Sequence, residues 1–239
     1  MTREYEIITE GQVHKVVVSD DREAILAAKA AGTASVEVLG EGGSSFLTAY
    51  AVEKEEDVSR EYLEQVVRRH LGLPWEILKT RRLLIREFCP GDEAQVPEEP
   101  EDGEGDRVFR SRDLLEAYIR SQYGFWGYGI WALTERETGA IIGKAGVTNL
   151  EWGSKENGEE EALELGYHIF RPWRGRGYGT EACEGILSWC AARGNMPVYA
   201  KTDASNEASA ALLKKLGFRL TDQRYTEPGQ RHNLFVRNY

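Results

Sequence analysis

Seven consecutive residues alternate glycines with arginines and other polar residues: Arg174-Gly175-Arg176-Gly177-Tyr178-Gly179-Thr180. The flanking pattern predicts a strand over Glu164–Phe170 and a helix over Thr180–Arg193. Glycine lets backbone N–H groups approach a ligand without a side chain in the way. The first N–H groups of a helix have no partner within the helix and lie at the positive end of its dipole. The segment therefore predicts an anion-binding loop, most simply for phosphate.

The glycine spacing separates this loop from other phosphate-binding loops. It does not fit the dinucleotide fingerprint G-x-G-x-x-G, nor a Walker-type loop ending in G-K-[ST]. It does fit R-x-x-G-x-G, with Arg174, Gly177 and Gly179 in register. An ordinary glycine-rich turn has the same composition, so the downstream sequence has to decide between the two.

Two further signals follow the loop in order. Met196–Thr202 has the pattern of a strand, and the sequence N-x-x-S comes next, with Asn206 and Ser209. A short apolar helix is expected over Ala210–Leu216. Gly217 then suits the left-handed residue that ends a helix, and Phe218 begins the next strand.

The R-x-x-G-x-G loop, the N-x-x-S motif and the K-L-G-F helix end together resemble the GNAT acetyltransferase superfamily. The resemblance extends from about Thr80 to the C-terminus. TRRLLIREF at 80–88, ETGAIIG at 137–143 and ELGY at 164–167 are similar to segments of its ribosomal-protein N-terminal acetyltransferase branch. This resemblance implies an α/β fold with a mixed, strongly twisted sheet. The strands Glu164–Phe170 and Val198–Thr202 would run parallel and splay apart to admit acetyl-CoA.

The resemblance also implies a set of cofactor contacts. Backbone N–H groups of the glycine loop would hold the pyrophosphate of acetyl-CoA, and Arg174 or Arg176 would add positive charge. The backbone of Tyr199–Lys201 would pair with the pantetheine arm. The expected cofactor-binding residues are Gly166, Tyr167, Arg174, Gly175, Arg176, Gly177, Tyr178, Gly179, Thr180, Asn206 and Ser209.

Amine acetylation needs a base for the ammonium proton and an acid for the leaving thiolate. Glu164 is the candidate base; alternatively it is an exposed strand residue or acts through water. Many members of the superfamily carry a tyrosine acid at the position of Leu213 here, so that group is missing. Members of the N-terminal acetyltransferase branch instead use the serine of N-x-x-S, which is Ser209. Ser209 could equally bond the helix backbone, and Asn206 could bond pantetheine or cap the helix.

Composition limits the function classes. The chain has 239 residues and a formal net charge of −10, which argues against nucleic acid as the main partner and suits a cationic amine. It has no apolar run of membrane-spanning length and no signal peptide, so we expect a cytoplasmic protein without a membrane partner. The four histidines lack ligand spacing, and no catalytic metal is expected. Cys183 and Cys190 fit reduced core cysteines.

The first 76 residues predict a separate small α/β domain. A strand over Val13–Asp20, a helix over Arg22–Ala31 and a strand over Thr33–Leu39 form a βαβ pattern, and Ser44–Val52 is a third strand candidate. The run with Asp20-Asp21 is similar to the last acidic motif of haloacid-dehalogenase-type phosphatases. No nucleophilic D-x-D strand precedes it, so we interpret it as a truncated remnant or a look-alike without catalytic function. We expect this domain to pack on the C-terminal domain, residues 80–239, or on a second copy of the chain as a homodimer.

The segment Gly91–Asp106 is rich in acidic residues and has no basic one. We expect a mobile surface loop that either attracts a cationic substrate or has no role. The sequence as a whole predicts an enzyme, an acyltransferase that moves an acetyl group from acetyl-CoA directly to a primary amine of a protein N-terminus or a small molecule. The alternatives are a non-catalytic acyl-CoA sensor, and a two-domain enzyme with a second ligand at Asp20 and Asp21.

Overall fold

The chain divides into two compact units that alternate along the sequence. The computed structural model describes residues 1–40, 43, 47–100, 102–150, 162–194, 196–227 and 230–238. One unit comprises Met1–Trp75, Phe88–Ala94 and Glu101–Gly127; the other comprises Glu76–Glu87, Gln95–Pro100 and Tyr128–Tyr239. The domains predicted from the sequence, residues 1–76 and 80–239, are each continuous along the chain, whereas these two units are interleaved. The division into domains at residues 76–80 therefore stays a prediction.

The first unit contains a four-stranded sheet in the order β1-β2-β3-β4. Its strands are β1 (Thr2–Thr9), β2 (Gln12–Ser19), β3 (Ala34–Val38) and β4 (Ala51–Val52). The hairpin between β1 and β2 turns through Glu10 and Gly11, whose φ angles of 50° and 75° suit a two-residue turn of type I′. The strands β2 and β3 are parallel and joined by α1, which confirms the βαβ pattern. β4 covers only the end of the predicted strand Ser44–Val52, and residues 44–46 lie outside the described part.

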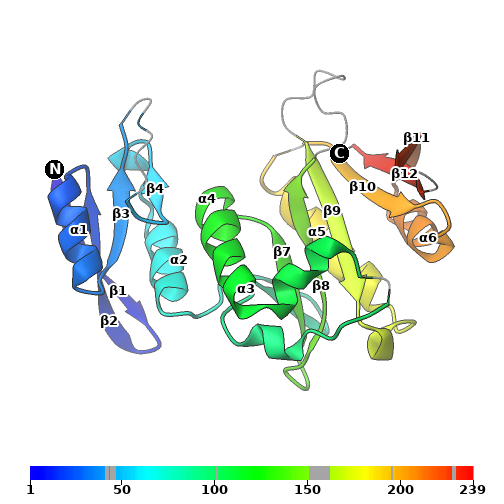
Figure 1. Cartoon of the computed structure of the whole chain (residues 1–239), viewed down its shortest axis with the longest axis horizontal. Helices are drawn as coiled ribbons and strands as arrows, with labels where there is room; N and C mark the ends of the chain where they lie inside the picture. The colour runs from blue at the N-terminus through cyan, green and yellow to red at the C-terminus, as the bar shows by residue number, and fades with distance from the viewer. Residues whose placement is uncertain are drawn as a thin grey trace. The chain divides into compact units, whose positions relative to one another are not determined.

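Two helices cover opposite faces of this sheet (Figure 1). They are α1 (Arg22–Ala30) and α2 (Arg60–His70), and Ser59 caps α2 by accepting a hydrogen bond from the N–H of Tyr62. The core between the sheet and α2 consists of Ile7, Val16, Val18, Ala34, Val36, Tyr50, Leu63, Val66 and Val67. This apolar cluster packs between the sheet and α2, and the burial of its side chains favours folding of the unit.

The acidic pair Asp20-Asp21 has local structural roles. Asp21 caps α1 by accepting a hydrogen bond of 2.9 Å from the N–H of Glu23, and Asp20 pairs with the amino group of Met1. Within the described residues, no three His, Cys, Asp or Glu side chains are grouped as metal ligands would be.

The rest of the first unit consists of short helical segments. They are η1 (Glu55–Asp57), η2 (Asp92–Gln95), η3 (Glu104–Arg110), α3 (Arg112–Tyr118), the π-helical turn η4 (Ile119–Tyr123) and α4 (Gly124–Trp126). The described part of the acidic segment Gly91–Asp106 therefore contains η2 and the first residues of η3, where the sequence predicted a loop without regular structure. The reason is that some of its carboxylates are bonded within the protein; Asp92, for example, accepts the N–H of Cys89 at 2.8 Å.

The second unit is built on an eight-stranded mixed sheet in the order β11-β12-β10-β9-β8-β7-β6-β5. The strands are β5 (Glu76–Lys79), β6 (Leu83–Arg86), β7 (Ile130–Glu135), β8 (Ile141–Asn149), β9 (Leu163–Ile169), β10 (Val198–Asp203), β11 (Arg219–Glu227) and β12 (Gln230–Arg237). Neighbouring strands are antiparallel except β9 and β10, which are parallel. This arrangement confirms the α/β fold with a mixed sheet that the sequence predicts.

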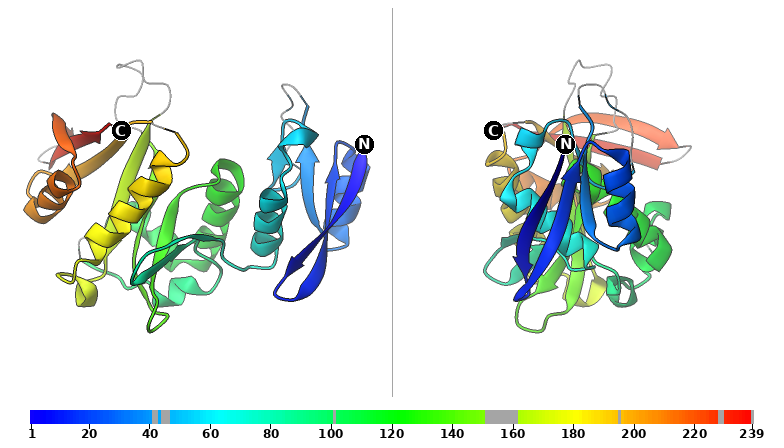
Figure 2. Two further views of the ribbon diagram at one scale, coloured as in Figure 1. Left: turned by 180° about the vertical axis from the view of Figure 1, so that it is seen from behind. Right: turned by 90° about the vertical axis from the view of Figure 1, so that its left-hand side faces the viewer.

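Helices complete this unit. After the 3-10 turn η5 (Arg171–Trp173), α5 (Tyr178–Ala191) packs on β8 and β9, and Figure 2 shows it lying along the sheet. The helix α6 (Glu207–Lys215) follows β10. Gly217, directly after the C-cap Leu216, has the left-handed φ of 84° that the sequence predicts. No helix in the described ranges is both long enough and apolar enough to cross a bilayer.

The hairpin of β7 and β8 needs glycine where the two backbones approach closely. A Cβ atom built on Gly146 would lie 2.8 Å from the Cα of Ile130 and still closer to the carbonyl oxygen of Gly129. Backbone atoms cannot move aside as a flexible side chain can, so any larger residue has to force the two strands apart.

Gly146→Ala should therefore lower the free energy of unfolding by about 1–3 kcal/mol, the usual cost of overpacking. Urea denaturation followed by tryptophan fluorescence measures the change. Gly105→Ala is the matched control, because a Cβ atom there meets no atom within 4 Å and φ is not left-handed. Equal stability of the two variants would contradict this account of the hairpin.

Candidate acetyl-CoA site

The strands β9 and β10 begin side by side and then separate. Only two residue pairs align between them, Leu163 with Val198 and Glu164 with Tyr199. Beyond these pairs, β10 is paired along its length with β12 on its other edge. The backbone of β9 from Leu165 to Ile169 thus lacks a strand partner on the β10 side, as Figure 1 lets the reader follow. This opening is the splay that the resemblance implies, and it offers strand-like hydrogen bonds to an extended ligand arm.

The glycine loop enters α5 through two left-handed residues. Gly175 and Gly177 have φ angles of 74° and 80°, and Gly177 is the N-cap of α5 with no side chain bonded to the first turn. Space is limited at Gly179, because a Cβ there would lie 3.2 Å from the Cδ1 of Leu212 in α6. The first N–H groups of α5, up to Thr180, therefore stay available to an anion at the positive end of the helix.

The predicted cation Arg174 is held by a carboxylate from the acidic segment. Its Nη2 donates to Oε2 of Glu99 at 2.6 Å, and its Nε donates to the carbonyl of Ile169 at 2.6 Å. Oε2 of Glu99 also lies 2.6 Å from Nε2 of His168, and its Oε1 accepts the N–H of Arg171 at 2.7 Å. Glu99 is buried, with a relative exposure of 7%. Arg174 thus fastens the loop to Glu99, while Arg176 is exposed, with its guanidinium 5.3 Å from the ring centroid of Trp173.

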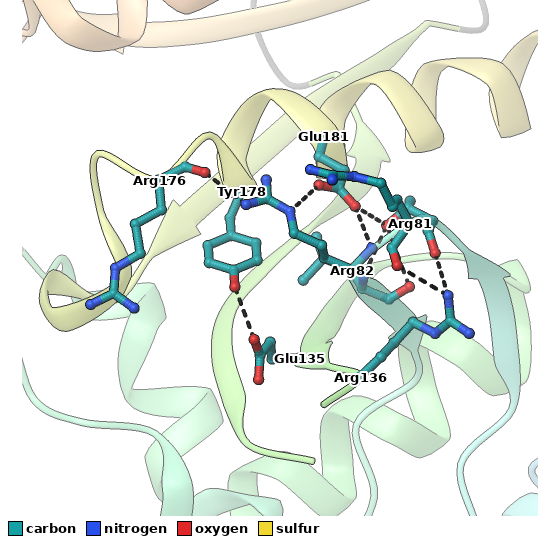
Figure 3. A network of polar contacts seen from close by, with 9 residues as sticks. Arg81, Arg82, Glu135, Arg136, Arg176, Tyr178 and Glu181 are labelled. Carbon is teal, nitrogen blue, oxygen red and sulfur yellow. Dashed lines mark hydrogen bonds and ion pairs between the residues drawn. The ribbon is translucent and has the colours of Figure 1, made fainter. Parts of the chain in front are cut away.

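A second network holds the other end of the loop (Figure 3). Arg82 donates from Nε to Oε2 of Glu181 in α5 at 2.7 Å, and from Nη1 to the carbonyl of Arg176 at 2.9 Å. Tyr178 lies beneath the guanidinium and donates its hydroxyl to Glu135 at 3.0 Å. Hydrogen bonds from Thr138, and then from Tyr178, outweigh burial and hold the pKa of Glu135 below its usual value.

The N-x-x-S motif lies at the start of α6. Asn206 is the N-cap and accepts the N–H of Ser209 at 3.0 Å, so the capping role weighed for Asn206 is realised in this structure. The hydroxyl of Ser209 lies 2.6 Å from the hydroxyl of Tyr167, which comes from β9 on the other side of the opening. Burial raises the pKa of Tyr167 to about 12, against a smaller opposing effect of the bond to Ser209. Leu213 is fully buried, so it contributes to packing.

Glu164 occupies the last pair before the strands separate, facing Tyr199 on β10 and Thr148 on β8. This register places Glu164 at the head of the opening. Gly166, two residues further along β9, lies opposite Gly146, and a Cβ on it would approach the Cδ1 of Ile130 at 3.2 Å. The structure thus brings together the glycine loop, Tyr167 and Ser209 around the splayed strands.

Sequence reasoning missed Glu99, Arg82, Glu181 and Glu135. Glu99 is one of many acidic residues in its segment, and nothing in the local pattern singles it out. Arg82 and Glu181 are 99 positions apart, and no periodicity connects them. The cysteines agree with the prediction of core residues: burial raises the pKa of Cys183, and it raises that of Cys190 to about 11.

Glu99→Ala should destabilise the second unit by about 1–3 kcal/mol, because it leaves the N–H of Arg171 without its acceptor and removes the anion that Arg174 and His168 share. Chemical denaturation measures the loss. Glu98→Ala is the control, since Glu98 is exposed beside it and should change stability by less than about 0.5 kcal/mol. A Glu99 variant as stable as the control would contradict the anchoring role.

Comparisons with known proteins agree on the fold and the family. The acetyltransferase (GNAT) domain family matches residues 82–219. A structure described as a GNAT-family acetyltransferase from Bordetella pertussis is 25% identical, with a TM-score of 0.55, over 67% of this chain and 98% of the other. The ribosomal-protein-S5-alanine acetyltransferase from Vibrio fischeri is 16% identical, with a TM-score of 0.53, over 67% and 95%. RimL, a ribosomal L7/L12 alpha-N-protein acetyltransferase, is 15% identical, with a TM-score of 0.52, over 70% and 96%.

The family match covers more than half of the chain and includes the splayed strands, the glycine loop and α6. Acetyl-CoA is the co-substrate of this family, and the chain carries the family's loop in the expected place. The protein belongs to the GNAT acetyltransferase family and is an acetyl-CoA-dependent acetyltransferase.

Proposed function

We propose that this enzyme transfers the acetyl group of acetyl-CoA directly to a primary amine, with the glycine loop binding the diphosphate of the cofactor. The observation that carries the proposal is the opening between β9 and β10, with the uncapped start of α5 beside it. An extended pantetheine arm can pair with β9 there while the loop binds the diphosphate. The cofactor contacts assigned from the sequence, which also include Gly166, Tyr167 and Asn206, are part of this proposal.

Glu164 is the proposed base. An amine attacks only when deprotonated, which at neutral pH costs about 4–5 kcal/mol for a lysine-type amine and about 1 kcal/mol for an α-amine. A carboxylate at the head of the opening can accept this proton directly or through water. The α-amine of a protein N-terminus is the less demanding acceptor. Two of the similar structures are named as acetyltransferases of ribosomal proteins, which supports the same choice.

Ser209 is the proposed proton donor to the leaving thiolate, while Tyr167 behind it donates its proton to the serine oxygen and regains one from solvent water. A serine hydroxyl donates best when its own oxygen accepts a hydrogen bond, and the hydroxyl of Tyr167 lies 2.6 Å away. Because its pKa is about 12, Tyr167 stays protonated at neutral pH and can serve as that donor. The two hydroxyls would then replace the tyrosine acid that many members of the superfamily carry at the position of Leu213. Because Tyr167 acts on the thioester sulfur only through Ser209, it is a positioning residue in this step.

Ser209→Ala should lower kcat by about 10²- to 10⁴-fold with little change in the KM for acetyl-CoA, because the acid acts on the leaving group. Tyr167→Phe should lower kcat by about tenfold, the effect of one hydrogen bond. The assay is thiol release with a reactive α-amine acceptor. Ser188→Ala on the exposed face of α5 is the control and should match the wild type. An unchanged kcat in Ser209→Ala would remove the acid assignment.

The acceptor class can be tested with an amine panel. Peptides with a free N-terminus should release thiol faster than the same peptides with a blocked N-terminus and a free lysine side chain, since the α-amine has the lower pKa. Small primary amines complete the panel. If only small amines react, the protein N-terminus is the wrong acceptor.

The second candidate, a non-catalytic acyl-CoA sensor, rests on the leucine at position 213, where many members of the superfamily carry a tyrosine acid. Calorimetry that detects acetyl-CoA binding, with no thiol release over the whole panel, would support this candidate and contradict catalysis.

A further inference from the structure

Arg82 lies far from the glycine loop in sequence but contacts it in the fold. It precedes β6, and its side chain reaches the junction between the loop and α5 (Figure 3). The guanidinium bonds one residue on each side of that junction. Nε donates to Glu181 at 2.7 Å and Nη1 donates to the carbonyl of Arg176 at 2.9 Å. A Cβ built on Gly177, the left-handed residue between them, would lie 3.5 Å from Nη2 of Arg82.

The aromatic ring of Tyr178 also contacts the guanidinium of Arg82. The Cζ atom of Arg82 lies 4.2 Å from the centroid of this ring, a distance at which a cation is attracted to the ring face. The hydroxyl of Tyr178 is fixed in turn by Glu135 at 3.0 Å. Two hydrogen bonds and a stacking contact thus determine the orientation of Arg82. A flexible lysine could provide the charge but not this planar arrangement.

Glu181 creates an electrostatic problem for an anion site. It lies in the first turn of α5, where its negative charge would repel a phosphate group. Burial alone raises its pKa, but hydrogen bonds from the Thr80 hydroxyl and from the backbone N–H and guanidinium of Arg82 outweigh this effect. The pKa of Glu181 therefore lies below its usual value, and the residue is ionised at neutral pH. The charge of Arg82 compensates it.

The carbonyl of Arg176 presents a similar problem. A carbonyl oxygen directed at the bound anion would oppose the N–H groups around it. In this structure the oxygen accepts the hydrogen bond from Arg82. The same guanidinium therefore engages both negative groups at this end of the loop, the carbonyl of Arg176 and the carboxylate of Glu181.

We propose that Arg82 is a positioning residue for acetyl-CoA, holding Arg176 and Glu181 so that the glycine loop binds the diphosphate. The inference rests on the proposed function, because it requires the diphosphate to bind at the loop. It assigns a role in cofactor affinity to a residue outside the R-x-x-G-x-G motif. Catalysis of the acetyl transfer itself is independent of Arg82.

The test compares two acetyl donors, acetyl-CoA and acetyl-pantetheine, which lacks the diphosphate and nucleotide. Arg82→Ala should raise the KM for acetyl-CoA by about 10- to 100-fold, as expected for the loss of a charge-assisted hydrogen bond. The kcat at saturating acetyl-CoA and the kcat/KM for acetyl-pantetheine should stay at the wild-type values. Arg60→Ala, which breaks an exposed Arg–Glu pair in α2, is the matched control and should change neither.

Second-site variants test the compensation of charge. Arg82→Ala leaves the carboxylate of Glu181 unpaired beside the anion, so adding Glu181→Gln should restore part of the affinity for acetyl-CoA. Arg82→Lys should fall between the wild type and Arg82→Ala. If Arg82→Ala does not fold, as circular dichroism would reveal, the milder Arg82→Lys should still raise the KM for acetyl-CoA alone.

The possible outcomes distinguish a failure of the role proposed for Arg82 from a failure of the proposed diphosphate site. A loss with both donors, or an unchanged KM for acetyl-CoA, would overturn the role of Arg82 while leaving the enzyme's function intact. A wild-type enzyme that uses acetyl-pantetheine as well as acetyl-CoA would overturn the diphosphate site itself, and this inference with it. A selective loss for acetyl-CoA, partly reversed by Glu181→Gln, is the expected result.

Discussion

The parting of β9 from β10 is the constraint on which the rest of the site depends. A strand has two edges, and β10 uses one along six residues to pair with β12 and the other for only two pairs with β9. The exposed edge of β9 is a liability in most sheets, because it invites another chain to pair. In this fold the same unpaired edge suits an extended ligand arm. The helices that follow the two strands, α5 and α6, then present the glycine loop and Ser209 at the opening.

Two carboxylate–arginine pairs bracket the glycine loop. Glu99 with Arg174 holds the beginning of the loop, and Glu181 with Arg82 holds its end. Each pair joins a segment remote in sequence to the loop, and each carboxylate accepts additional backbone N–H groups, from Arg171 and from Arg82 itself. An unpaired carboxylate here would repel the diphosphate that is proposed to bind at the loop. Each arginine therefore has two effects: it holds the loop in place, and it neutralises the negative charge of the carboxylate beside the loop.

This arrangement divides the arginines of the motif between different tasks. Arg174, in register with the R-x-x-G-x-G pattern, bonds Glu99 and the carbonyl of Ile169, whereas Arg176 is exposed and stacks near Trp173. The hydroxyl pair of Tyr167 and Ser209 also joins two separate elements, a strand and a helix. In the proposed function, this pair takes the place of the tyrosine acid that is absent at position 213.

The sequence by itself determined the features that depend on local backbone geometry. The left-handed residue at Gly217, Asn206 as a possible helix cap and the strand–loop–helix order follow from residue type and spacing, because φ/ψ limits and helix ends are local properties. Only the tertiary structure decided that Arg82 meets Glu181, that Arg174 meets Glu99 and that Tyr167 meets Ser209. These partners are 99, 75 and 42 positions apart. Such pairs form only when packing brings distant segments together. Neither the periodicity nor the composition of the sequence predicts which polar side chains will be partners.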